Sequence, residues 1–110
     1  MNQQIAVLFD GNYRIASFDN VTNITVLKKE NEEWIADCKI PCAMSGLDDS
    51  LVLQSVKAAV RHMKDCRVIV GESFPEPVAE YLCGLGFIMC REQRFSSSRL
   101  DEISEELYSD

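Results

Sequence analysis

Apolar residues follow a strand-like rhythm in the first forty positions of the chain and a helical rhythm afterwards. Residues 5–9 are apolar at every position, which is typical of a central strand covered on both faces. This run ends in a strong turn signal at residues 10–12, Asp-Gly-Asn, and residues 14–18 are predicted to form a short extended piece. We therefore expect the first strand to lie in the interior of a sheet.

A β-hairpin is predicted between Ile24 and Ile40. Apolar and polar residues alternate there as in two strands, the polar residues 30–33 form the turn, and Pro41 ends the second strand. The residues of the second strand that are expected to share one dry face are Trp34, Ala36, Cys38 and Ile40. We therefore predict that Trp34 is buried.

Helices alternate with short buried strands in the second half of the predicted structure. A first helix is expected to begin at Asp49, with Asp48, Asp49 or Ser50 as its cap, and its apolar positions are Val52, Leu53, Val56, Ala59, Val60 and Met63. Residues 66–70 form a second buried strand, which Gly71 closes. A second helix follows with Pro75 in its first turn, and Ser73 is its candidate cap.

A third buried strand is predicted at residues 87–90, and a last helix follows it. That helix has Leu100, Ile103, Leu107 and Tyr108 on one face, and Ser98 with Asp101 resembles a capping box. Five of the 18 acidic residues of the chain lie in residues 101–110. We therefore predict a single α/β domain over residues 1–95, with an acidic C-terminal helix at residues 96–110 that is loosely packed on it.

The predicted elements follow the order β-β-β-α-β-α-β, with the tail helix at the end. Antiparallel strands at the start and a β-α-β-α-β run afterwards require one mixed sheet with helices on its faces. With the first strand in the centre and right-handed crossovers, the strand order is 3-2-1-4-5, the ribonuclease H-like arrangement. The fold class is thus predicted to be α/β.

A ligand crevice is expected at the carboxyl end of the first strand, because the sheet grows in both directions from that strand. Two loops meet there, the turn 10–12 and the loop 71–75. The second loop opens a helix, whose free N–H groups favour an anion. The candidate binding residues are Gly11, Asn12, Gly71 and Ser73, and the glycines allow a ligand to approach the backbone closely.

The net charge of −7, from 18 acidic and 11 basic residues, disfavours a nucleic-acid partner, because phosphates repel an acidic surface. The longest apolar runs are far shorter than the ~20 residues of a membrane-spanning helix. The first four residues lack the pattern of a secretion signal, and five cysteines without a C-x-x-C pair are typical of reduced thiols. We therefore expect a cytoplasmic protein without a nucleic-acid or membrane partner.

Four short segments carry a family resemblance. They are residues 5–7 (Ile-Ala-Val), 66–71 (Cys-Arg-Val-Ile-Val-Gly) with the helix after them, 84–87 (Gly-Leu-Gly-Phe) and the hairpin turn 28–34 (Lys-Lys-Glu-Asn-Glu-Glu-Trp). The first three resemble nitrogenase cofactor-biosynthesis proteins of the NifX, NafY and NifB C-terminal type. The hairpin turn resembles more specifically the iron-only nitrogenase accessory proteins of the AnfO type.

This resemblance implies a non-enzymatic protein that binds or carries an iron–sulfur cofactor or its precursor, or that assists nitrogenase maturation. Its implied partners are nitrogenase components or cofactor-assembly proteins. NifX-type proteins have a His-Phe-Gly turn whose histidine is a candidate cluster ligand, whereas this chain has Ser17, Phe18 and Asp19 there, so imidazole cannot ligate at that position.

Thiolates are the usual ligands of iron–sulfur clusters, and the chain offers Cys42 in the loop after Pro41. If a cluster binds, we therefore expect Cys42 to supply the ligand in place of the missing histidine; the alternative is an ordinary loop thiol without a ligand role. The cluster would dock where the turn 10–12, the loop 42–46 and residues 71–74 meet. Residue spacing identifies no separate metal site.

Two other classes of function remain open: an enzyme, of either of two kinds, and a small binding module. A ribonuclease H-like nuclease would need three or four converging carboxylates, and only Asp10 and Glu72 reach the crevice, so we interpret Asp10 as a turn former. A cysteine nucleophile would need His62 to reach Cys42 or Cys90 across the fold, and we interpret His62 as a surface group at a helix end. The other function is that of a small module, unrelated to nitrogenase, that binds an anion or a protein partner.

Overall fold

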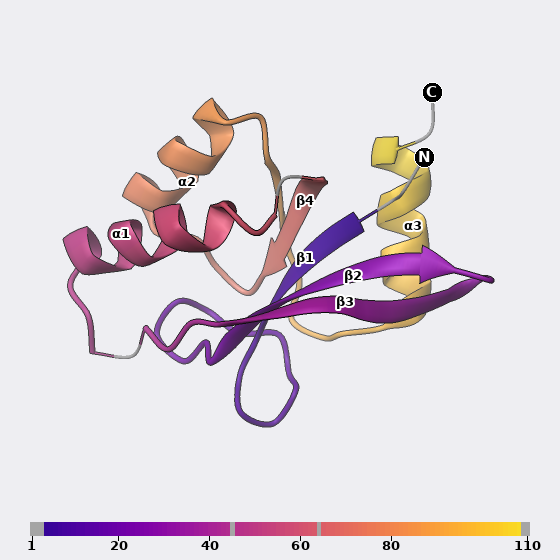
Figure 1. Ribbon diagram of the computed structural model, residues 1–110, viewed down its shortest axis with the longest axis horizontal. Helices are drawn as coiled ribbons and strands as arrows, with labels where there is room; N and C mark the ends of the chain where they lie inside the picture. Colours follow the sequence, from indigo (N-terminus) through magenta and orange to yellow (C-terminus); the bar gives the residue numbers. More distant parts are fainter. Residues whose placement is uncertain (1–3, 45, 64, 109–110) are drawn as a thin grey trace.

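Five strands form one mixed sheet that lies between two layers of helices (Figure 1). The computed structural model describes residues 4–44, 46–63 and 65–108; Ser45, in the loop 42–46 that we expect to border a ligand, lies outside them. The elements are β1 (Gln4–Phe9), β2 (Asn23–Glu30), β3 (Glu33–Pro41), α1 (Asp49–Val60), β4 (Cys66–Gly71), α2 (Glu76–Gly84), β5 (Ile88–Arg91) and α3 (Ser97–Tyr108).

The strand order is β3-β2-β1-β4-β5, which confirms the prediction. The central strand β1 pairs with β2 in the antiparallel sense and with β4 in the parallel sense, so that Ile5 lies opposite both Leu27 and Val68. All six residues of β1 are buried, as the unbroken apolar run predicts. The carboxyl ends of β1 and β4 therefore lie side by side.

The sheet has an apolar cluster on each face. On the face covered by α1 and α2 lies the α1/α2 cluster, whose buried members include Ala6, Leu8, Ile24, Ile69, Val52, Val56, Ala59, Met63, Val78 and Leu82. On the other face lies the α3 cluster, which comprises Ile5, Val7, Phe9, Ile15, Leu27, Val68, Val70, Leu100 and Ile103. Alternate residues of β1 therefore supply both clusters.

A β-bulge in the hairpin changes which residues of β3 share a face. Val26 lies opposite Cys38, whereas the next residue of β2, Leu27, lies opposite Ala36, so Asp37 is the extra residue. An extra residue shifts the alternation of side chains by one position. The prediction of one shared dry face is therefore wrong. Cys38 and Ile40 face the α1/α2 cluster, but Trp34 packs half-buried against the α3 cluster, and Ala36 is exposed.

The helix ends confirm one predicted cap and contradict two. Asp48 caps α1, because its Oδ1 accepts a hydrogen bond from the Leu51 N–H at 2.9 Å. The residue before α2 is Pro75, which makes no side-chain hydrogen bond, so the expected Ser73 cap is wrong. At α3 the Ser96 hydroxyl accepts from the Arg99 N–H at 3.0 Å in place of the predicted Ser98 box. Among the described residues, no helix is both long and apolar enough to cross a membrane.

The predicted third buried strand, β5, is an edge strand. Ile88 and Arg91 at its ends are exposed, and Met89 and Cys90 between them are half-buried. An edge strand has a neighbour on one side only, which is why an apolar sequence there does not become fully buried.

Candidate functional site

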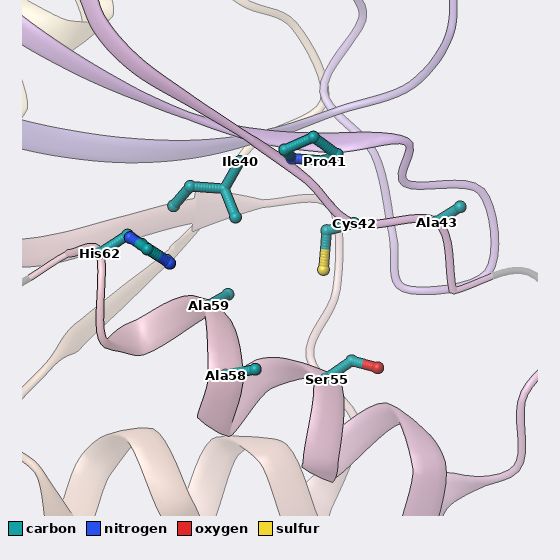
Figure 2. Close-up of a pocket in the computed structure, with 8 residues that line it drawn as sticks. All are labelled: Ile40, Pro41, Cys42, Ala43, Ser55, Ala58, Ala59 and His62. Carbon is teal, nitrogen blue, oxygen red and sulfur yellow. The ribbon is translucent and has the colours of Figure 1, made fainter.

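An open groove of about 460 Å³ lies between the end of β3 and α1 (Figure 2). From the β3 side it is lined by Ile40, Pro41, Cys42 and Ala43, and from the α1 side by Ser55, Ala58, Ala59 and His62. The four residues on the α1 side recur at the three- and four-residue spacing of one helix face. Because three of them are small, they leave space between the helix and the strand end.

Cys42 presents its sulfur to this groove from a fixed backbone position (Figure 2). Its N–H donates to the Thr22 carbonyl at 2.9 Å, which continues the pairing of β2 with β3 by one residue. We expected a thiol in the loop after Pro41, but Cys42 is buried in the α1/α2 cluster. Burial raises the pKa of the Cys42 thiol above its ordinary value of 9.0, so the group is neutral at pH 7.

His62 lines the same groove as Cys42. Its N–H donates to the Ala59 carbonyl at 2.9 Å, so the backbone makes one more turn after α1 and carries the exposed ring to the end of the groove. The expectation that a histidine and Cys42 lie across the fold from each other is therefore wrong. The signal that could have found the pair is the small-residue face of α1, which leads from Ser55 to His62.

The predicted crevice at the carboxyl ends of β1 and β4 is a second hollow, of about 320 Å³. It is lined by Asp10, Arg14, Ile15, Asn20, Glu72 and Gln93. Asp10 Oδ1 accepts hydrogen bonds from the N–H groups of Asn12 at 2.8 Å and Arg14 at 3.0 Å. These two bonds, Arg14 first, lower the pKa of Asp10, and the Arg14 guanidinium at 3.3 Å adds to the effect. Asp10 therefore stabilises the turn, and the Asn12 N–H already donates to Asp10 rather than to a ligand.

Packing explains why residue 71 is a glycine. A Cβ there would lie 2.7 Å from Leu8 Cδ1 and 3.1 Å from Phe74 Cζ, so neighbouring side chains fill the space that a ligand would need. Gly11 and Ser73 are exposed. The first turn of α2 contains an acid, Glu76, and Pro77, which has no N–H. The start of α2 is thus a poor anion site.

The five predicted site residues divide between two places. Cys42 lies in the groove, whereas Gly11, Asn12, Gly71 and Ser73 lie in the two loops at the crevice; the two hollows have no lining residue in common among the described residues. Nor does another thiol reach the groove in the described part of the chain. Cys66 is buried, and desolvation raises the pKa of its thiol to about 12.

Residues 4–44, 46–63 and 65–108 bring no three histidine, cysteine or acidic side chains together in a way that could hold a metal ion. A complete four-thiolate cluster site is therefore not formed by this part of the chain. The donor set that the groove offers is one thiol and one imidazole.

The family model of the iron-only nitrogenase protein AnfO matches residues 4–109, which is essentially the whole chain. The chain belongs to the AnfO family. This confirms the resemblance carried by the hairpin turn 28–34, and membership supports an accessory role beside the iron-only nitrogenase, with nitrogenase-related proteins as partners. Curated proteins give no match to the chain.

Proposed function

We propose that this protein is a non-catalytic accessory factor of the iron-only nitrogenase that carries an iron–sulfur cofactor or its precursor as cargo. The observation that carries the proposal is the AnfO family match over residues 4–109. The groove between β3 and α1 is the proposed cargo site, because a soft sulfur ligand and an imidazole line it together. Its volume of about 460 Å³ lies within the range of small-ligand pockets.

A two-residue donor set suits a cargo that arrives already assembled. Building a cluster from bare iron and sulfide on one chain takes about four thiolates, which the described residues do not gather. An assembled cluster brings its own sulfides, so Cys42 and His62 need only fill the remaining positions on one or two irons. Few protein bonds also make release to an acceptor protein easier.

Burial of the Cys42 thiol makes cargo binding dependent on pH. Iron binds the thiolate, and burial raises the pKa of Cys42, so ligation at neutral pH must first remove a proton. Cargo affinity is therefore expected to increase as the pH rises from 7 toward the ordinary thiol value of 9.0. At neutral pH the cost of deprotonation weakens the bond, which is the behaviour required of a carrier.

Anaerobic loading of the purified protein tests the proposed site. The protein is mixed with a preassembled iron–sulfur cluster, and bound iron and visible absorption are measured after gel filtration for wild type, Cys42→Ser and His62→Ala. We expect Cys42→Ser to lose most of the bound iron and His62→Ala to lose part of it. Cys83→Ser is the matched control, because Cys83 is an exposed thiol on α2, away from the groove, and should keep wild-type loading.

Equal loading of wild type and Cys42→Ser would remove the groove from the proposal. The accessory role is tested separately, by the activity of iron-only nitrogenase matured in cells that make wild type, Cys42→Ser or no protein. Activity that does not depend on the protein would refute the accessory role, whatever the loading experiment shows.

A further inference from the structure

Two exposed aromatic side chains flank a buried one: Tyr13 in the loop after β1 and Phe95 before α3 both contact Phe9. Tyr13 is 66% exposed and Phe95 is 40% exposed. Both make edge-on contacts with the buried ring of Phe9, at centroid distances of 6.5 Å and 5.4 Å. Phe9 itself belongs to the α3 cluster, so the aromatic pair is anchored on the core of the sheet.

The turn that carries Tyr13 is locked in an unfavourable backbone conformation. Tyr13 has φ of 59°, a left-handed value that bulky residues rarely adopt. The turn is held by the Asp10 carboxylate, which binds two N–H groups, and by backbone bonds from Tyr13 N to the Asp10 carbonyl and from Asp10 N to the Arg14 carbonyl. Strained backbone of this kind clusters at functional sites such as ligand clamps.

Positive charges surround the aromatic pair. A hollow of about 340 Å³ is lined by Tyr13, Arg14, Gln93, Arg94 and Phe95, and none of these described lining residues is acidic. The Arg14 side chain is 73% exposed, and the Lys39 ammonium lies 4.9 Å from the centre of the Tyr13 ring. The chain as a whole carries a net charge of −7, so this basic and aromatic surface differs from the protein around it.

We propose that the surface formed by Tyr13, Arg14, Arg94 and Phe95, the aromatic–arginine surface, docks an acidic segment of a protein partner. Tyrosine, phenylalanine and arginine are residues that protein interfaces use preferentially, and the arginines match carboxylates of the partner. An acidic partner is repelled by most of the molecule and attracted here, so charge also orients the encounter.

The neighbouring acids set the direction of the docked segment. Asp10 is paired with Arg14, whose side chain is still 73% exposed, and Glu72 lines the adjoining hollow and repels carboxylates. On the other side, Glu92 lines a hollow with Arg94 and Phe95, but Glu92 is paired with Arg99. The acidic segment therefore lies on the Arg94 side and places an apolar side chain between Tyr13 and Phe95. This surface does not include the Cys42 groove, so the inference stands independently of the cargo.

A nuclear magnetic resonance titration of the ¹⁵N-labelled full chain tests this surface. The probe is a synthetic glutamate-rich peptide with one central phenylalanine, and its counterpart carries glutamine in place of glutamate. We expect the acidic peptide to shift the signals of residues 11–14 and 93–96. Arg94→Glu and Phe95→Ala are each expected to weaken binding about tenfold, whereas their matched controls Arg61→Glu and Leu85→Ala, which are exposed elsewhere, keep wild-type binding.

Three outcomes would overturn the inference: equal binding of the glutamine peptide, shifts that map elsewhere, or no shifts with either peptide. A single-stranded thymidine oligonucleotide that displaces the peptide would instead assign the surface to nucleic acid and overturn the protein partner. Cys42→Ser must bind the peptide as wild type does. Its failure to load a cluster would then leave this surface intact, which separates the two proposals.

Discussion

The attachment of α3 to the sheet can be tested by replacing Ile103 with alanine. Ile103 is 1% exposed and packs in the α3 cluster against residues of β1 and β4. The substitution removes most of a fully buried side chain and leaves a cavity under the helix. Replacing a buried isoleucine by alanine lowers the free energy of unfolding by about 3 kcal/mol, within a usual range of roughly 2–5 kcal/mol.

This loss of unfolding free energy should produce a large fall in the thermal midpoint, Tm. For a chain of this length the entropy of unfolding near the midpoint is about 230 cal/mol/K, so 3 kcal/mol corresponds to a fall in Tm of roughly 13 °C. The matched control is Leu85→Ala, because Leu85 is 51% exposed at the end of α2. Its cost should stay within about 0.5 kcal/mol, or roughly 2 °C.

Thermal unfolding followed by far-ultraviolet circular dichroism gives both midpoints, and native-state hydrogen exchange gives the stability of each helix. We expect Ile103→Ala to lower the Tm and to accelerate exchange in α3, β1 and β4 together. The reasoning is refuted if the Tm of Ile103→Ala equals that of the control while only α3 amides exchange faster. In that case α3 detaches as a separate unit, and its burial adds nothing to the stability of the sheet.

Three further predictions follow from the packing, the charges and the thiols. Gly71→Ala should lower the free energy of unfolding by about 1–3 kcal/mol, because its Cβ meets a leucine methyl carbon at 2.7 Å, whereas Gly84→Ala, with no atom near, should be neutral or slightly stabilising in thermal melts. Hydrogen bonds from the Lys29 ammonium and the Trp34 indole N–H lower the pKa of Asp101 below 3.8. Its contribution to stability is therefore complete above pH 3.8 and is lost as the pH falls from there through the folded pKa. Urea midpoints of wild type should fall more steeply in acid than those of Asp101→Asn. In timed alkylation with iodoacetamide followed by mass spectrometry, the exposed Cys83 should react first and Cys66 last, because the Cys66 thiol is buried and its pKa is about 12.

The arrangement of the sheet could be predicted because it depends on strong local signals. The apolar run 5–9 requires cover on both faces, and right-handed crossovers then leave one strand order. The bulge at Asp37 could not be predicted, because an extra residue in β3 leaves the alternation of the sequence unchanged and shows only in the pairing with β2. One residue was enough to move Trp34 to the other face.

The sequence predicted the chemistry of single residues in the candidate site but not which residues the fold brings together. The sulfur of Cys42 suggested a soft ligand, and the turn at Asp10 suggested the crevice. The structure places these residues in two separate hollows, because Cys42 lies where the end of β3 meets α1. The groove brings together residues twenty positions apart, Cys42 and His62, and the sequence signals this only through the small-residue face of α1. The cap of α3 was missed because the neighbouring serines Ser96 and Ser98 have equal capping chemistry.

The two edges of the sheet determine how this protein can meet others. At one edge, β3 carries the bulge at Asp37, charged side chains and Pro41, and at the other edge β5 has only four residues. Twisted, charged or very short edges are poor templates for an added strand. Backbone pairing between copies, the first step toward fibrils, is therefore disfavoured at both edges. The edges therefore favour recognition of partners through side chains over recognition through an added strand.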